Sequence, residues 1–278
     1  MESQLGVQVR STHALRGGLS SAVHLLEVGT RAGKRERVVL RRYVRPELNV
    51  EEPDLPGREA QALRVVAKLP LPTPRLLGLE PTGAAAGVPA LLMSWLPGRL
   101  VWHPRDLEAW LQRLAEPLPA IHAGRVPRGL ALSSYAPYPP LTFAPPAWAR
   151  QPQVWRQAAE LFQGEPPALP AVLIHRDFHP GNVLWLRGRI SGLVDWQAAC
   201  LGPAVVDIGH CRANLLAVGS GAASRFTACW EQLSGERFHP WADVVAIVGL
   251  LDGLREGRPD DAAAIEEALA RAVAELRG

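Results

Sequence analysis

The sequence has few cysteines, no long hydrophobic run and no marked excess of charge. Every apolar run falls short of the ~18 residues that a membrane helix needs, and the first ten residues, MESQLGVQVR, contain no apolar signal-peptide core. The cysteines Cys200, Cys211 and Cys229 have no metal-binding spacing and are odd in number, which favours free thiols in a reducing compartment. We therefore expect a cytoplasmic protein without a membrane partner.

The composition is that of an ordinary globular protein. The 278 residues are 47% hydrophobic and 21% charged, which is enough chain for one large domain or two lobes. The net charge is only +3, and most basic residues are scattered. A basic run between Arg31 and Arg45 is more often a solvated hairpin than a nucleic-acid surface. We expect no nucleic-acid partner.

Residues 22–28 and 38–44 alternate like strands on either side of a turn, which predicts an antiparallel pair. A glycine-rich loop precedes the first of them. Its glycines would let backbone N–H groups approach a phosphate closely, and its serines would add hydroxyl donors. The candidates for this contact are Gly17, Gly18, Ser20 and Ser21. A plain turn is the commoner origin of such a loop.

The next two elements allow a buried ion pair. Alternation along the second strand places Arg41 and Arg42 on opposite faces, so one of them points inward if one face is core. Residues 57–69 have helical spacing, and Glu59 lies on the apolar side of that helix, where a carboxylate needs a cation. The alternative is an edge strand with exposed arginines and a glutamate stabilised by the helix dipole.

A linker is predicted near residue 95. Residues 76–79 and 89–96 have strand character, and the second run leads into Pro97 and Gly98. We predict a strand-rich lobe over residues 1–95 and a mostly helical lobe over residues 96–278. Helices are expected at residues 104–122 with a bend at its prolines, and at 154–162, 207–217, 220–233, 241–251 and 262–276. The many prolines of residues 127–152 predict an irregular loop on the substrate side.

Polar side chains gather in the apolar stretch of residues 173–195. Asn182 and Asp195 bracket a predicted hairpin, which brings their oxygens together at its open end. Amide and carboxylate oxygens are hard ligands suited to Mg²⁺. Asp177 lies in the loop before the hairpin, where it could orient an attacking hydroxyl and accept its proton. This division of labour matches phosphoryl transfer.

The segment HRDFHPGN, followed by VDW and GPAVVDIGH, resembles the aminoglycoside phosphotransferase and choline kinase family, relatives of the protein kinases. The resemblance covers nearly the whole chain and implies a two-lobed, protein-kinase-like α+β fold. Its N-terminal lobe would hold an antiparallel sheet with one helix, and its larger C-terminal lobe would be mostly helical. It also implies Mg²⁺ as cofactor and ATP or GTP as co-substrate.

The same resemblance implies roles for single residues. Asp177 corresponds to the catalytic aspartate, and Asn182 and Asp195 to the metal ligands. Glu59 would pair with the phosphate-binding cation, which is usually lysine in this fold and is Arg41 here; its guanidinium demands different geometry. The remaining implied roles are nucleotide contacts by Met93, Ser94, Trp95 and Leu96, and support of the catalytic loop by His175 and Asp207. His179 receives no role.

The molecule that would accept the phosphoryl group is the least determined part of this prediction. Aminoglycoside kinases present acidic residues from C-terminal helices, and Asp243 and Asp252 are the candidates here, although a solvated helix face is the commoner reading. Tryptophans of the second lobe would suit an aromatic-lined site but are more often core. The sequence predicts a small-molecule kinase acting on an antibiotic, sugar or amino-alcohol type of acceptor.

Two other functions stay open. The first is a catalytically weak or inactive nucleotide-binding regulatory protein of the same fold. The second is a protein kinase, although only about a dozen residues separate Asp195 from Asp207, too few for a peptide-docking segment. The sequence leaves the choice between monomer and dimer undetermined.

Overall fold

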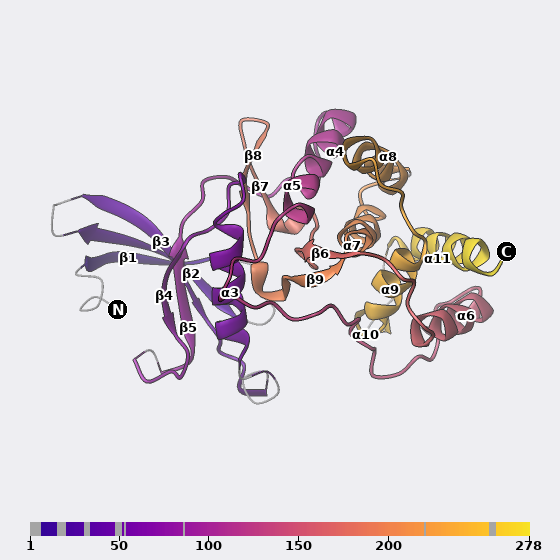
Figure 1. Cartoon of the computed structure of the whole chain (residues 1–278), viewed down its shortest axis with the longest axis horizontal. Coiled ribbons are helices and arrows are strands. Elements are labelled where there is room, and N and C mark those ends of the chain that lie inside the picture. Colours follow the sequence, from indigo (N-terminus) through magenta and orange to yellow (C-terminus); the bar gives the residue numbers. More distant parts are fainter. Residues whose placement is uncertain are drawn as a thin grey trace.

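The computed structural model describes residues 7–15, 21–30, 34–47, 52, 54–85, 87–219, 221–255 and 260–278. They form two lobes, one built on an antiparallel sheet and the other mostly helical (Figure 1). The sheet lobe comes first in the chain, and the C-terminus lies at the far end of the helical lobe. The predicted two-lobed α+β fold is confirmed.

The sheet has five antiparallel strands in the order β1–β2–β3–β5–β4. They are β1 Val7–Leu15, β2 Ala22–Thr30, β3 Arg35–Arg42, β4 Leu76–Glu80 and β5 Ala90–Ser94. Alternation turns Leu26, Val28, Val38 and Leu92 to one buried face. The strand β1 was not predicted, because its described side chains are all exposed or half-buried and give no apolar stripe.

The opposite face of the sheet is covered by helix α3 (Leu55–Val66), the one helix of this lobe that was predicted. Its buried side includes Leu63 and Val66, which belong to one core with Leu91 and Met93 of β5. The helix begins two residues earlier than expected because Pro56 fits its first turn, where a missing N–H costs nothing.

The second lobe is built from helices that pack around two apolar cores, one of which extends into the sheet lobe. They are α4 Leu107–Ala115, α5 Leu118–His122, α6 Pro152–Gln163, α7 Val205–Leu215, α8 Ala222–Ser234, α9 Trp241–Gly249, α10 Leu251–Arg255 and α11 Ala262–Arg277. The predicted helix at residues 104–122 is broken at Pro117, as its prolines indicated. The most deeply buried tryptophans, Trp155, Trp196 and Trp230, are core residues.

Two short strand pairs sit between the lobes. The hairpin β7 (Val183–Leu186) and β8 (Arg189–Leu193) turns at Arg187 and Gly188, both with positive φ, as a tight two-residue turn requires. The pair β6 (Ala171–Ile174) and β9 (Cys200–Pro203) was not predicted, because four-residue apolar strands carry no distinctive periodicity. A short 3-10 turn, η1 (Pro180–Asn182), directly precedes β7, and a second, η2 (Trp196–Ala198), follows β8.

The linker after β5 is packed against the hairpin. Gly98 has φ +138, and a side chain there would meet Ser191 Oγ at 2.4 Å. Ser191 Oγ donates to the carbonyl of Pro97 at 2.5 Å, and Arg99 pairs with Trp185. These contacts hold the linker after β5 against the β7–β8 hairpin. No helix among the described residues combines the length and apolarity needed to span a membrane.

Candidate active site

The backbone of residues 175–177, the predicted catalytic loop, is held by a buried carboxylate. Asp207 of α7 has no exposed surface, and it accepts hydrogen bonds from the backbone N–H of His175 at 3.0 Å and of Arg176 at 2.6 Å. His122 Nε2 lies 3.1 Å from the same carboxylate. Asp207 thus fixes the two residues that precede Asp177.

His175 links this loop to the end of the hairpin. Its ring is fully buried, lies 4.3 Å from the ring of Trp196 and bonds through Nε2 to the carbonyl of Val194 at 3.0 Å. The one polar contact of its ring among the described residues is to the backbone beside Asp195, so the buried ring of His175 links the loop to the hairpin and does not face the open side of the site. This is the placement that a bracing residue requires.

Asp177 projects from the loop toward the open side, with 35% of its side chain exposed. His210 Nε2 lies 2.9 Å from Oδ1, and Asn182 Nδ2 donates to Oδ2 at 2.8 Å. Burial acts to raise the pKa of Asp177, but the hydrogen bond and charge of His210 outweigh it and lower the pKa to about 2. The carboxylate is therefore ionised and held from both oxygens.

His179 is the second histidine beside Asp177. Its Nε2 lies 3.7 Å from Asp177 Oδ1, and its Nδ1 accepts a hydrogen bond from the N–H of Gly181. Burial lowers its pKa to about 4, so the ring is neutral near pH 7. With Nδ1 accepting, the proton sits on Nε2. The three side chains Asp177, His179 and His210 come within reach of one cation, but this tautomer of His179 leaves no lone pair for it.

Asn182 and Asp195 lie at the open end of the hairpin. Val183 pairs with Leu193, and the N–H of Val194 donates to the carbonyl of Asn182 at 3.0 Å. The side-chain amide nitrogen of Asn182 donates to the backbone carbonyl and to Oδ2 of Asp177. Its Oδ1 is therefore the atom that could bind a metal ion. An amide oxygen beside a carboxylate is the hard donor set that Mg²⁺ takes. These residues fit a magnesium ion.

Arg41 is the inward arginine of β3, and it joins the lobes. Its Nη1 lies 3.2 Å from Glu59 of α3 and 2.8 Å from Asp195 Oδ1, and the hydroxyl of Tyr43 also bonds to Glu59. Burial opposes the charge of Arg41, but Glu59 and Asp195 outweigh it and raise its pKa further. The chain has two lysines, Lys34 and Lys68, and neither is at this position. The guanidinium of Arg41 therefore stands where the resemblance led us to expect a lysine ammonium group.

The predicted nucleotide contacts fall into two groups. Gly17, Gly18 and Ser20 lie outside the described residues, and Ser21 is a buried residue at the start of β2. The linker group, Met93, Ser94, Trp95 and Leu96, forms the end of β5 and the segment after it. Met93 is buried in the core, Ser94 bonds to the backbone of Arg75, and Trp95 lies under the guanidinium of Arg37. Their contact with a nucleotide remains a prediction.

A cavity of about 390 Å³ opens beside Asp177 and His210. Its aromatic wall is Tyr135 and Tyr138 from the irregular loop after α5, and its apolar floor comes from α9, including Val245. This loop was expected on the substrate side. His210 was missed by the sequence analysis, although it lies three residues after Asp207 on the same helix, a spacing that places both near the catalytic loop.

The structure does not bring the two acidic acceptor candidates to this cavity. Asp243 is buried and forms a two-pronged ion pair with Arg212, at 2.7 and 2.8 Å, and Asp252 accepts from the backbone N–H of Leu141. Asp243 is needed to neutralise a partly buried arginine, which a sequence pattern does not reveal. The expectation of an acidic acceptor site on these helices is corrected by this placement.

Comparisons with known proteins agree with this geometry. A model of the family described as "Phosphotransferase enzyme family" matches residues 11–228. The crystal structure of aminoglycoside phosphotransferase APH(4)-Ia is similar at a TM-score of 0.66, with 20% identity over 100% of this chain and 97% of that chain. Macrolide 2′-phosphotransferase MphH from Brachybacterium faecium is similar at 0.62, with 16% identity over 98% and 96%. At such identities the likeness shows the fold alone.

A thermostable mutant of APH(4)-Ia in ternary complex with AMP-PNP and hygromycin B has a TM-score of 0.68 and 19% identity, and covers 100% of this chain and 97% of that chain. Two curated relatives are homoserine kinases. That of Chelativorans sp. is 31% identical over 190 residues, covering 59% of this chain and 54% of the relative. That of Rhizobium etli is 28% identical over 194 residues, covering 64% and 57%. The chain thus spans little more than half the length of these relatives.

Proposed function

The chain belongs to the phosphotransferase enzyme family, and on that premise we propose that it transfers the γ-phosphoryl group of ATP or GTP to a hydroxyl of a small molecule. The acceptor is an alcohol of the antibiotic, sugar or amino-alcohol type. Two kinds of relative support this range, because one group is named for aminoglycosides and macrolides and the other for homoserine. The cytoplasm remains the expected location.

One observation carries the proposal: the carboxylate of Asp177 is ionised, oriented and open to a cavity. Its oxygens are held by His210 and Asn182, so an acceptor hydroxyl that enters the cavity meets a carboxylate of fixed direction. Positioning of this kind supplies much of the rate enhancement in phosphoryl transfer.

In the proposed reaction, Asp177 accepts a hydrogen bond from the acceptor hydroxyl and takes its proton as the oxygen attacks the γ-phosphorus. The bond from that phosphorus to the bridging oxygen of the nucleotide breaks, and the nucleoside diphosphate leaves. Asn182 and Asp195 would hold Mg²⁺, which when bound would neutralise charge on the phosphates. Arg41 places a fixed positive charge beside Asp195 and is aligned by Glu59.

The test is an acceptor screen with Mg²⁺ and ATP or GTP, across aminoglycosides, macrolides, cholines, sugars and homoserine. We expect nucleotide binding and transfer to at least one acceptor, both measured on the same preparation. Asp177→Asn is the matched control, because it keeps the side-chain shape and removes the charge. Failure to bind Mg²⁺-nucleotide, or unchanged transfer in Asp177→Asn, would contradict the proposal.

A second candidate, a nucleotide-binding regulatory protein with weak or no turnover, is favoured by one contact. Arg41 Nη1 lies 2.8 Å from Asp195 and so competes with the metal for one of its oxygens. If this competition limits catalysis, Arg41→Lys should raise turnover, because a lysine has one point charge to share between Glu59 and Asp195. Turnover in the wild type that is unaffected or lowered by Arg41→Lys would exclude this candidate.

A further inference from the structure

Arg176 is a partly buried cation without a carboxylate partner in the described part of the chain. It directly precedes Asp177, and its φ of +69 lies in the left-handed region. The guanidinium lies 3.8 Å from the ring centre of Tyr138 and 5.3 Å from that of Tyr135, and Nη2 donates to the carbonyl of Ala136. The other N–H groups of the fork have no hydrogen-bond acceptor among the described residues.

The remaining charges around the cavity are already paired. Asp177 is bonded to His210, and Glu52 forms an ion pair with Arg58. Of the charged side chains that line this cavity in the described residues, Arg176 is the one that forms no ion pair. A polycationic acceptor would meet that charge at close range, whereas an anion would neutralise it.

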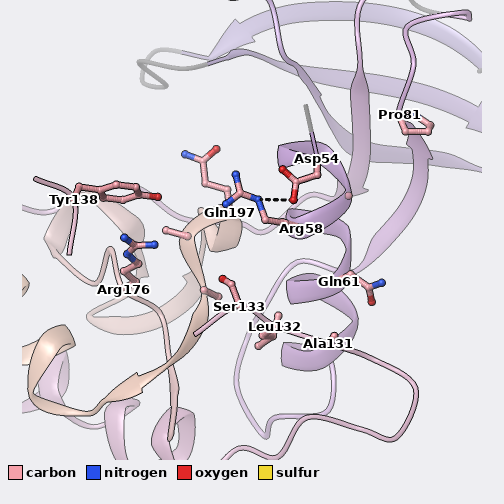
Figure 2. A pocket seen from close by; sticks show the side chains of 13 residues that line it. Asp54, Arg58, Gln61, Pro81, Ala131, Leu132, Ser133, Tyr138, Arg176 and Gln197 are labelled. Carbon is pink, nitrogen blue, oxygen red and sulfur yellow. Dashed lines mark ion pairs between the residues drawn. The ribbon is translucent and has the colours of Figure 1, made fainter. Parts of the chain in front are cut away.

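Arg176 also stands where two cavities meet. The second, of about 280 Å³, shares Tyr138, Arg176 and Gln197 with the first and extends toward Arg58 on α3. Figure 2 shows the guanidinium of Arg176 next to the ring of Tyr138, across this second cavity from Arg58. A ligand in either cavity can thus reach the same cation.

Resting on the proposed function, we propose that Arg176 binds a carboxylate of the acceptor, so that the acceptor is a hydroxy acid and not a polycationic sugar. A guanidinium presents parallel N–H groups that match a carboxylate, and such charge-assisted pairs are the strong ones. The tyrosine rings cover the carbon skeleton, and Asp177, the next residue, receives the hydroxyl. Arg176 is then a residue that determines specificity.

Matched probes separate the carboxylate from the rest of the acceptor. L-homoserine, 4-hydroxybutyrate and pantothenate each carry a hydroxyl and a carboxylate, and 3-aminopropan-1-ol, propan-1-ol and panthenol are their counterparts without the carboxylate. Kanamycin and erythromycin represent cationic acceptors. We expect transfer to at least one hydroxy acid, with kcat/KM about 30-fold or more above its counterpart, as one charge-assisted pair supplies.

The variants Arg176→Gln and Arg176→Lys both keep a side chain at the same positive φ, so backbone strain is unchanged. We expect Arg176→Gln to lower kcat/KM for the hydroxy acid about 30-fold, mainly through KM, and to leave the counterpart unaffected. Arg176→Lys should restore part of the loss. Arg156→Gln is the matched control, since Arg156 is exposed on α6 and lines neither cavity, and should change kcat/KM less than about threefold.

The results separate failure of the role proposed for Arg176 from failure of the proposed kinase function. Preference for kanamycin or erythromycin, equal use of both members of a pair, or an equal loss on both members in Arg176→Gln would overturn the role of Arg176. Binding of Mg²⁺-ATP without transfer to any hydroxy acid would also overturn it, while the proposed kinase function would stand. Failure to bind Mg²⁺-ATP or Mg²⁺-GTP would instead overturn the proposed function.

Discussion

The two sides of the catalytic loop differ sharply. On the inner side, His175 and the Asp207 carboxylate are fully buried, and their contacts are with the protein backbone and aromatic rings. On the outer side, Arg176 and Asp177 are partly exposed and face cavities. The same short segment thus contains a rigid support and a set of side chains that are free to meet ligands.

The difference shows how one loop can be both stable and reactive. Hydrogen bonds from backbone N–H groups to a buried carboxylate stabilise the loop whether or not a ligand is bound. The outer groups contribute less to stability because solvent screens them, so their charges remain available for chemistry. Variants on the two sides should therefore separate loss of stability from loss of activity.

The largest effect is expected for Asp177→Asn on the outer side. Removing the proton acceptor should lower kcat about 10³-fold, within the range for general-base catalysis. The free energy of unfolding should change by less than about 1 kcal/mol, because the side chain is a third exposed. Steady-state kinetics and urea unfolding check both halves. A large loss of stability would erase the contrast between the two sides.

Asp207→Asn should give the opposite pattern on the inner side. The amide removes the charge and places an N–H group against the backbone donors of His175 or Arg176, so we expect a loss of about 3 kcal/mol of unfolding free energy. Thermal unfolding should fall by roughly 6 °C. Unchanged thermal stability would show that the loop does not depend on this carboxylate.

His179 should make stability depend on pH. Its pKa of about 4 in the folded protein is below the ordinary 6.5, so its contribution is complete above pH 6.5 and is lost as the pH falls toward 4. Between pH 7.5 and 4.5 the wild type should lose about 2 kcal/mol relative to His179→Asn, which keeps an acceptor for the N–H of Gly181. Parallel urea curves for both proteins would contradict this.

The smallest effect is expected for His210→Ala. Loss of its hydrogen bond lets the pKa of Asp177 rise from about 2 toward its ordinary value, yet the carboxylate stays ionised at pH 7. We expect a loss of about fivefold in kcat from poorer orientation, with the acid limb of the kcat profile moving to higher pH. His210→Gln should retain most of the rate, since its amide can donate to the same oxygen.

Short-range patterns predicted much of the fold. The alternation of residues 22–28 and 38–44 and the helical spacing around Glu59 are local, and all three elements were found, with ends shifted by up to three residues. The strands β6 and β9 were missed because their pairing joins segments about thirty residues apart, and short apolar runs do not specify a partner. Nor does a pattern identify the partner of a buried charge, which is why Asp243 was misplaced.

By itself the sequence determined the larger elements, the resemblance to a phosphotransferase family and the residues of the H-x-D-x-x-x-x-N segment, because each depends on spacing along the chain. Only the tertiary structure decided what surrounds Asp177. His210 reaches it from α7, and Tyr135 and Tyr138 from a distant loop, while Asp243 is bound by Arg212. Electrostatic and packing contacts of this kind are set by distance in space, and that distance depends on the whole fold.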